Sequence, residues 1–177
     1  EVISVYPVFE SFDISSEVHL REKPLRNPKF IVDVNIGKLA NKLRLLGFDT
    51  LYNNKYMDSE FIKISIDEKR TILTRDIDLL KNGKVTHGCW IRSQNAFEQV
   101  REVVKRFQLE NSISPFSRCT NCNQSLKKVK KESVIDHIPE SVKNNFHEFM
   151  ICYSCNKVYW KGSRYDRICK WITEMRK

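Results

Sequence analysis

The residues Phe30-Ile31-Val32-Asp33-Val34 decide the fold, because they form a continuous apolar run that a single acid interrupts. A run of this kind is typical of a strand that is buried on both faces of a parallel sheet. Apolar residues then recur at helical spacing over 36–46, and Gly47 ends the predicted helix. Together, the strand and the helix predict the start of an α/β domain.

The same alternation continues to about residue 110. Three further strand-like runs are predicted, at 50–52, 71–74 and 89–91. Asp58 opens a predicted helix, and Ser93 is expected to cap a longer amphipathic helix whose inner face carries Phe97. Lys38 and Arg44 fall on other faces of the first helix, where we expect them to be solvated. Strands that alternate with helices predict a parallel sheet covered on both sides.

The first 29 residues hold one strand-like piece, at 2–6, and a stretch that prolines interrupt. This is too little to fold alone, so we expect the tail of a truncated domain followed by a linker. The chain begins with Glu1, which places the expected natural start upstream. Neither a signal peptide nor an apolar run of membrane-spanning length is present, so a cytoplasmic location without membrane contact is expected.

Two CxxC pairs are the most specific pattern in the chain, and they consist of Cys119, Cys122, Cys152 and Cys155. Two thiolates from one turn can bind the same metal ion, and a second such turn completes a tetrahedral zinc site. A closed site of four cysteines leaves no open coordination position, so this zinc is expected to be structural. Disulfide pairing is the alternative, which the absence of secretory features disfavours. Cys89 and Cys169 lie in apolar surroundings and are expected to pack as small hydrophobic residues.

The charge of the chain is concentrated near its C-terminus. The formal net charge of the 177 residues is +9, and residues 117–177 carry 13 basic and six acidic side chains, a net of +7. The same segment holds the two CxxC pairs and ends in a predicted basic helix from about Ser163 to Arg176. A basic excess of this size favours a polyanionic partner such as nucleic acid. A lysine-rich surface without such a partner is the alternative.

Four acids are predicted to gather at the carboxyl ends of the parallel strands, where ligands bind in open α/β sheets. Asp33 lies near the end of the first strand, Asp58 opens the helix after the second, and Asp76 and Asp78 follow the third. Crowded carboxylates repel one another unless cations neutralise them, which predicts bound Mg²⁺ or Mn²⁺. Two such ions stabilise the attacking and leaving oxygens of a phosphodiester displacement.

Each of these acids also has a structural explanation. Asp58 can serve only as a helix N-cap, and Asp76 or Asp78 can cap the short helix that follows the third strand. Asp33 is hardest to explain in this way, because a carboxylate within an apolar strand is costly without a partner. We therefore expect Asp33 above all to be functional.

The sequence resembles the Mut-seven C-terminal ribonuclease family. The resemblance is carried in order by the stretches 30–40, 43–50, 72–76, 118–123 and 152–163. Residues 5–9 are similar to the end of a ubiquitin-like domain that often precedes this unit. The chain departs from the family at Arg164, where a histidine is usual, and at Asn41 and Lys42, which replace an Arg-Trp-like pair.

The resemblance implies a PIN-like three-layer α/β domain over 30–112, then a small zinc ribbon with a basic helix over 113–177. Residues 1–29 would be the ubiquitin-like tail and linker. It implies metal-dependent cleavage of RNA, with Asp33, Asp58 and Asp76 in the positions of PIN acids and Asp78 as a fourth. Mg²⁺ or Mn²⁺ on Asp33 and Asp76 would activate a water for in-line attack, which leaves 5′-phosphate and 3′-hydroxyl ends. Zinc would bind Cys119, Cys122, Cys152 and Cys155.

Basic side chains are expected to bind the phosphates of a single-stranded or structured RNA. These residues are Arg75, Lys127, Lys128, Lys130, Lys131, Lys161, Arg164 and Arg167. Tyr159 and Trp160 either stack on bases or belong to the core of the ribbon. The competing hypothesis is a non-catalytic RNA-binding or scaffold module whose acidic site is vestigial. A protein-interaction domain is a third possibility.

Overall fold

The computed structural model describes residues 28–175 of the chain. The strand expected at 2–6, and the tail and linker up to residue 27, lie outside the described residues. None of the helices within 28–175 has the length and apolar character that crossing a membrane requires.

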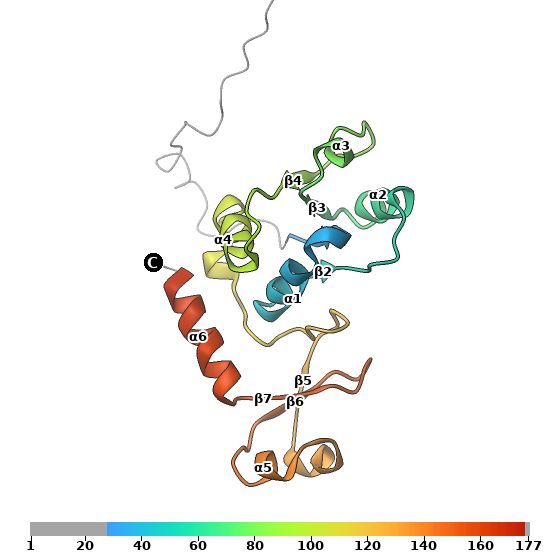
Figure 1. Ribbon diagram of the computed structural model, residues 1–177. Helices are drawn as coiled ribbons and strands as arrows, with labels where there is room; N and C mark the ends of the chain where they lie inside the picture. Colours follow the sequence, from blue (N-terminus) through green and yellow to red (C-terminus); the bar gives the residue numbers. More distant parts are fainter. Residues whose placement is uncertain (1–27, 176–177) are drawn as a thin grey trace, which may run out of the picture.

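The first part of the chain forms a four-stranded sheet in which all paired strands are parallel, as predicted (Figure 1). The strand order is β2-β1-β3-β4. The strands are β1 (Phe30–Val32), β2 (Thr50–Leu51), β3 (Thr71–Thr74) and β4 (Gly88–Trp90). Because all four run the same way, their carboxyl ends lie at one end of the sheet and their amino ends at the other.

Helices cover both faces of this sheet and give it three layers. On one face, Phe30 and Val32 of β1 pack in a single cluster with residues of α1 (Gly37–Leu45) and α4 (Ala96–Arg106). On the other face, Ile31 packs with residues of α2 (Asp58–Asp67) and α3 (Ile77–Leu80). Successive side chains of a strand point to opposite faces, which explains why the apolar run divides in this way. The predicted α/β architecture is confirmed.

Gly47 ends the first helical segment, and its backbone conformation explains why glycine is needed there. Its φ is +96°, in the left-handed region that residues with a side chain rarely adopt. A Cβ at this position would also collide with the carbonyl oxygen of Ser114. The tight turn brings the chain back into β2.

Two details of the longest predicted helix were wrong. α4 begins at Ala96, and its N-cap is Asn95, whose Oδ1 accepts hydrogen bonds from the N–H groups of Phe97 and Glu98. The hydroxyl of Ser93 instead accepts a hydrogen bond from the N–H of Asn95. Phe97 is not on the inner face, since 47% of its surface is exposed.

The second part of the chain is a three-stranded antiparallel sheet, as expected for a zinc ribbon. Its strands are β5 (Lys127–Val129), β6 (Phe149–Ile151) and β7 (Val158–Trp160), in the order β5-β6-β7. Between β5 and β6, the chain forms the 3₁₀ turns η5 (Lys131–Ser133) and η6 (Ile135–His137) and the short helix α5 (Glu140–Lys143). Their buried side chains, such as Val134 and Val142, form a separate small core with Phe149.

The C-terminal helix α6 (Ser163–Met175) leaves the ribbon and returns to the α/β part, as Figure 1 shows. Ile172 belongs to the same buried cluster as Val100 of α4. The rings of Trp171 and Phe97 meet edge to face, with 5.0 Å between their centroids. The Nζ atom of Lys42 lies 3.4 Å from the centroid of Phe97. The helix that we assigned to the ribbon therefore shares a core with the α/β part, and a division at residue 112 stays a prediction.

Candidate functional site

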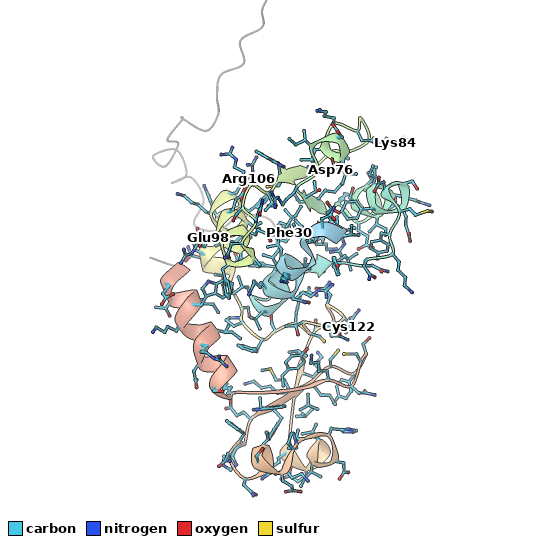
Figure 2. The ribbon with its side chains drawn as sticks, viewed as in Figure 1. Phe30, Asp76, Lys84, Glu98, Arg106 and Cys122 are labelled. Atoms are coloured by element: carbon cyan, nitrogen blue, oxygen red, sulfur yellow. The ribbon has the colours of Figure 1, made fainter. Side chains whose placement is uncertain are left out.

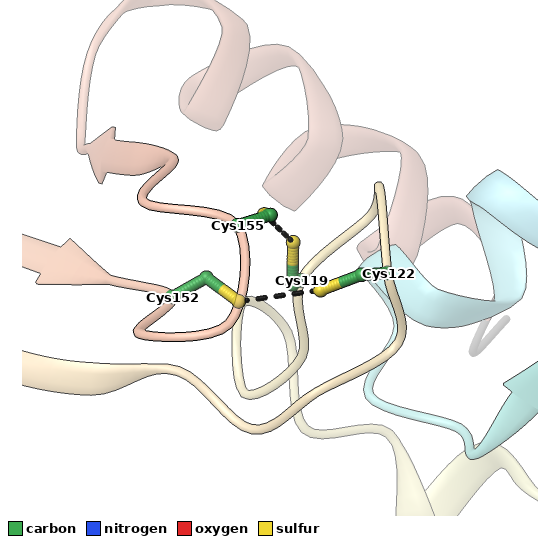
Figure 3. Close-up of side chains that lie close together, drawn as sticks. All are labelled: Cys119, Cys122, Cys152 and Cys155. Atoms are coloured by element: carbon green, nitrogen blue, oxygen red, sulfur yellow. Dashed lines mark hydrogen bonds between the residues drawn. The ribbon is translucent and has the colours of Figure 1, made fainter.

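The two CxxC loops bring their four sulfur atoms together (Figure 3). The Sγ atoms of Cys119 and Cys155 are 3.5 Å apart, and those of Cys122 and Cys152 are 3.3 Å apart. All four lie within 4.8 Å of one another, and all four cysteines are free. Four thiolate donors at this spacing fit a tetrahedral metal ion such as zinc. This agrees with the ligand set that the sequence predicts.

The two loops have the same backbone construction. In each, the N–H of the first cysteine donates to a carbonyl five residues later, from Cys119 to Gln124 and from Cys152 to Lys157. In each, the residue after the second cysteine is an asparagine with a positive φ, +69° at Asn123 and +55° at Asn156. Asparagine tolerates this conformation better than most residues. The sulfur cluster is thus built from two copies of one turn.

Tyr159 supports the first loop from β7. Its hydroxyl lies 3.1 Å from the Sγ of Cys119 and accepts a hydrogen bond from the N–H of Thr120 at 3.1 Å. Burial raises the pKa of the Cys119 thiol, but hydrogen bonds from Tyr159 and from nearby backbone N–H groups outweigh it and lower the pKa to about 6. A thiol with this pKa is ready to bind a metal as a thiolate. These contacts give Tyr159 a structural role at the cysteine loop.

Arg44 joins the first CxxC loop to the parallel sheet. Only 4% of its surface is exposed, so the expectation that it is solvated was wrong, whereas Lys38 is exposed as predicted. Its Nε donates to the carbonyl of Thr50 at 2.8 Å. Its Nη1 donates to the carbonyls of Thr120 and Asn121, at 3.2 and 2.8 Å. One buried guanidinium therefore bonds to the outer strand of the sheet and to the backbone between the two cysteines.

Asn123 makes the matching contact from the loop side. Its Oδ1 accepts a hydrogen bond from the N–H of Thr50 at 3.0 Å. Both outward-facing backbone groups of Thr50 are thus paired with side chains, the carbonyl with Arg44 and the N–H with Asn123. β2 is an outer strand of the sheet, and such strands need their unpaired backbone groups covered. The loop that carries the cysteines performs this covering.

An ion-pair network extends the junction. Asp49, which precedes β2, pairs with Arg70 at 2.7 Å and with Arg118 at 3.3 Å, and accepts a hydrogen bond from the Nδ2 of Asn123 at 2.8 Å. Arg70 is buried and also donates to the carbonyl of Phe30. These residues precede or begin strands, so the cysteine cluster is attached at the amino-terminal end of the sheet. Sequence reasoning missed this network, because no local pattern links residues 44, 49 and 70 to residues 118–123.

Asp33 and Asp76 lie at the opposite, carboxyl-terminal end of the sheet, and Thr74 connects them. Asp33 directly follows β1 and is only 9% exposed. Its Oδ2 accepts a hydrogen bond from the hydroxyl of Thr74 at 2.6 Å. The same hydroxyl oxygen accepts a hydrogen bond from the N–H of Asp76 at 2.9 Å. Within residues 28–175, neither acid forms an ion pair with lysine or arginine.

Asp76 also caps α3, which was one of the structural roles left open for it. Its Oδ1 accepts hydrogen bonds from the N–H groups of Asp78 and Leu79, and its side chain is exposed. Figure 2 labels Asp76 on the far side of the sheet layer from Cys122. The carboxylate of Asp76 therefore has a structural role at one oxygen.

The other two acids lie further out. Asp58 is the first residue of α2 and is exposed, and it does not cap the helix, because Met57 is the N-cap. Asp78 is highly exposed and pairs with Lys81 at 2.9 Å. Among the described residues, the cysteine cluster is the only group of three or more possible ligands within 4.8 Å of one another. The structure thus joins Asp33 to Asp76 through Thr74, while Asp58 and Asp78 lie outside any such compact group.

The basic residues predicted to bind RNA are spread over the surface. Arg75, Lys127, Lys128, Lys130 and Arg167 are exposed, and Lys131 is half-buried. Lys161 pairs with Glu148, while the side chain of Arg164 lies outside the described part of α6. Trp160 packs against the small core of the ribbon. Four of these lysines lie on β5 or directly after it, which makes one strongly basic segment at residues 127–131.

A cavity of about 380 Å³ lies at the amino-terminal end of the sheet and touches none of the four acids. It is lined by Pro28, Lys29, Gly47, Phe48, Asp49, Ser112, Ser114 and Arg118. Of the four acids, Asp58, Asp76 and Asp78 are exposed and Asp33 is nearly buried.

Comparison with known proteins identifies the family. A family model described as "Mut7-C RNAse domain" matches residues 28–172, which is most of the chain. Neither a search of curated proteins nor one of solved structures found a match. The matched range covers the parallel sheet, the cysteine cluster and most of α6. The chain therefore belongs to the Mut7-C RNAse domain family.

Proposed function

We propose that this protein is a ribonuclease that cleaves RNA at the carboxyl-terminal end of the parallel sheet, with a divalent metal ion bound by Asp33 and Asp76. The observation that carries the proposal is the chain of contacts from Asp33 through the Thr74 hydroxyl to the backbone of Asp76. These contacts hold the nearly buried Asp33 close to the exposed Asp76. Among the described residues, neither carboxylate has a basic partner.

The donor set suits Mg²⁺ or Mn²⁺. Magnesium is commonly bound through one or two carboxylates, with waters and substrate phosphates completing its coordination. Two acids at the end of neighbouring strands meet this need, and Asp58 and Asp78 are proposed as outer acids that orient waters or repel misplaced phosphates. When bound, such an ion supplies a hydroxide nucleophile at neutral pH and stabilises negative charge on the phosphate.

The residues of the chain have separate parts in this proposal. Thr74 orients the Asp33 carboxylate by donating to one of its oxygens. Arg75 lies between the strand end and Asp76 and is exposed, so it can neutralise an incoming phosphate. The zinc ribbon contributes phosphate contacts through its basic segment at 127–131 and through Lys161, Arg164 and Arg167, which position RNA without reading its sequence.

The decisive experiment compares the wild type with Asp33→Asn and Asp67→Asn on defined RNAs. Asp67 is an exposed acid at the far end of α2 and serves as the matched control. Added Mn²⁺ is expected to produce cleavage by the wild type and by Asp67→Asn. Asp33→Asn is expected to cleave at least about 100-fold more slowly while it binds RNA equally well. Zinc content is measured in parallel, so that a lost ribbon is not mistaken for a lost active site.

The same experiment separates the competing function. Intact RNA in every metal, combined with tight and salt-sensitive binding, would show a non-catalytic RNA-binding module. The exposed position of Asp58 and the capping role of Asp76 are the features that such a module would explain. Cleavage that Asp33→Asn does not reduce would place the active site elsewhere.

A further inference from the structure

Trp90 is an exposed aromatic residue at the carboxyl end of the outer strand β4. Its exposed fraction is 40%, although the neighbouring Cys89 is buried. Side chains alternate along a strand, so Trp90 points to the same face as Gly88. A Cβ on Gly88 would collide with the side chain of Leu80 in α3, which places both positions on the α3 face. Trp90 is therefore an exposed aromatic residue on the α3 face, at the carboxyl end of β4.

The register places Trp90 in one row with the candidate active site. Thr74 pairs with Trp90 across β3 and β4, and partners in a parallel pair share a face. Thr74 in turn donates to Asp33, which directly follows the strand on its other side. Neighbouring strands are about 4.8 Å apart, so Trp90 lies roughly 10 Å from Asp33 across the sheet. A short stretch of nucleic acid can span that distance.

Exposed apolar side chains also lie at the end of the sheet that carries Asp33 and Asp76. Val34 after β1, Met57 before α2 and Ile77 at the start of α3 are 40%, 71% and 49% exposed. Single exposed apolar side chains are normal, but these gather at the same end of the sheet as Trp90 and Asp76. The surface therefore places carboxylates, which could hold a metal ion at a phosphate, next to apolar side chains, which could contact a base.

Positive charge lies next to the Trp90 ring. The guanidinium carbon of Arg92 is 5.7 Å from the ring centroid, within the range of a cation–π contact. An aromatic face with an arginine beside it is the arrangement on which proteins stack the bases of single-stranded nucleic acids. A protein partner would need a wider apolar surface than one tryptophan and three separate aliphatic side chains.

We propose that Trp90 is a stacking platform for an unpaired base of single-stranded RNA, next to the phosphate that lies at Asp33 and Asp76. This inference rests on the proposed function, and it adds the substrate class. A base within a duplex is stacked between its neighbours and cannot reach the ring, whereas an unpaired base can. The platform therefore selects single-stranded RNA or unpaired loops.

Binding is tested in the Asp33→Asn background, without added divalent ions, so that the RNA is not consumed. Trp90→Ala and Trp90→Phe are compared with Ile66→Ala. Ile66 is also 40% exposed but lies near the opposite end of α2. The probes are a short single-stranded RNA and a duplex of the same length. Trp90→Ala is expected to weaken binding of the single strand about tenfold and to leave the duplex unchanged.

The conservative variant guards against a misfolded protein. Trp90→Phe keeps an aromatic face, so it is expected to bind the single strand within about threefold of its parent. The parent contains three tryptophans, and quenching of its fluorescence by the single strand should be largely lost in Trp90→Phe. Equal single-strand binding by the parent, Trp90→Ala and Ile66→Ala would overturn the proposal, as would equal losses on duplex and single strand.

Failure of the two proposals is distinguishable. If the wild type cleaves no RNA while Trp90→Ala still weakens single-strand binding, the platform stands and the catalytic proposal fails. If the wild type cleaves RNA and Trp90→Ala binds normally, the catalytic proposal stands and the platform fails. Failure of the parent to bind single-stranded RNA at all overturns the platform.

Discussion

At the amino-terminal end of the parallel sheet, two arginines are buried and hydrogen-bonded, whereas at the carboxyl-terminal end most of the acids are exposed. Arg44 and Arg70 are each less than 7% exposed and donate to backbone carbonyls of distant segments. Asp76 and Asp78 lie in solvent, and only Asp33 is enclosed. The first arrangement joins two sheets into one structure, while the second leaves oxygens available to a ligand.

Under the proposed function, this difference assigns stability to the amino-terminal end of the sheet and catalysis to the carboxyl-terminal end. Buried charges persist only where partners compensate for the water that they lose. Exposed acids cost little in stability and can be changed without unfolding the chain. Substitutions at the amino-terminal end should therefore alter unfolding and zinc content, and substitutions at the carboxyl-terminal end should alter cleavage.

The largest expected effect follows removal of one zinc ligand. Cys119→Ser should reduce the zinc content from one ion per chain to none, because each of the four sulfurs completes the site. Metal binding supplies much of the folding energy of a small ribbon. Because Arg44 bonds to the first CxxC loop, disorder in that loop should also destabilise the parallel sheet. We expect the thermal midpoint to fall by more than about 10 °C in circular dichroism. Cys169→Ser, outside the cluster, is the control, and one zinc retained in Cys119→Ser would contradict the ligand assignment.

A smaller loss of stability is expected when the hydrogen bonds between the sheet and the first CxxC loop are removed and all four cysteines are kept. Arg44→Met keeps most of the buried volume but removes three hydrogen bonds to the carbonyls of Thr50, Thr120 and Asn121. We expect the free energy of unfolding in urea to fall by about 3 kcal/mol. Lys38→Met, on the exposed side of the same helix, should change it by less than about 0.5 kcal/mol. Equal losses in the two variants would mean that the junction does not stabilise the fold.

Acid should weaken the amino-terminal end through Asp49. Burial raises the pKa of Asp49, but hydrogen bonds from Arg70 and Asn123 and the charges of Arg70 and Arg118 outweigh it and lower the pKa below its ordinary value of 3.8. The stabilisation is therefore complete above about pH 5 and is lost as the pH falls through the folded-state pKa. Asp49→Asn should lose about 1–2 kcal/mol at pH 7, and its difference from the wild type should shrink below pH 4. A difference that stays constant down to pH 2 would exclude this linkage, and Asp67→Asn is the exposed control.

The smallest expected effect on stability comes from the carboxyl-terminal end. Thr74→Val is nearly isosteric but removes the hydroxyl that joins Asp33 to Asp76. We expect a loss of about 1 kcal/mol in stability and a roughly tenfold slower cleavage, with unchanged zinc content. Thr74→Ser, which keeps the hydroxyl, should restore most of the rate. A normal rate in Thr74→Val would remove this residue from the positioning of the acids.

The parts of the fold that could be predicted have local causes. The apolar run at 30–34 predicted β1 because burial on both faces needs apolar side chains throughout, and Asp33 stood out for the same reason. The CxxC spacing predicted the cysteine cluster, since two ligands within one turn fix each half of the site.

The parts that could not be predicted depend on partners far away in the sequence. Arg44 looked like a solvated helix residue, yet its acceptors at Thr120 and Asn121 are 76 and 77 positions away. Trp90 lies in the strand-like run at 89–91, but this run does not indicate that β4 is an outer strand or that Trp90 is 40% exposed. Asn95 displaced Ser93 as the helix cap although both residue types cap helices well.

The paired asparagines that follow the two CxxC motifs have different freedom to change. Asn156 needs only to tolerate its backbone angle, so glycine should replace it at little cost. Asn123 has the same angle but also contacts Thr50 and Asp49 through its amide, and glycine cannot make these contacts. Among relatives, we therefore expect position 156 to vary and position 123 to remain asparagine. Two turns with the same backbone would then differ in the substitutions that they tolerate.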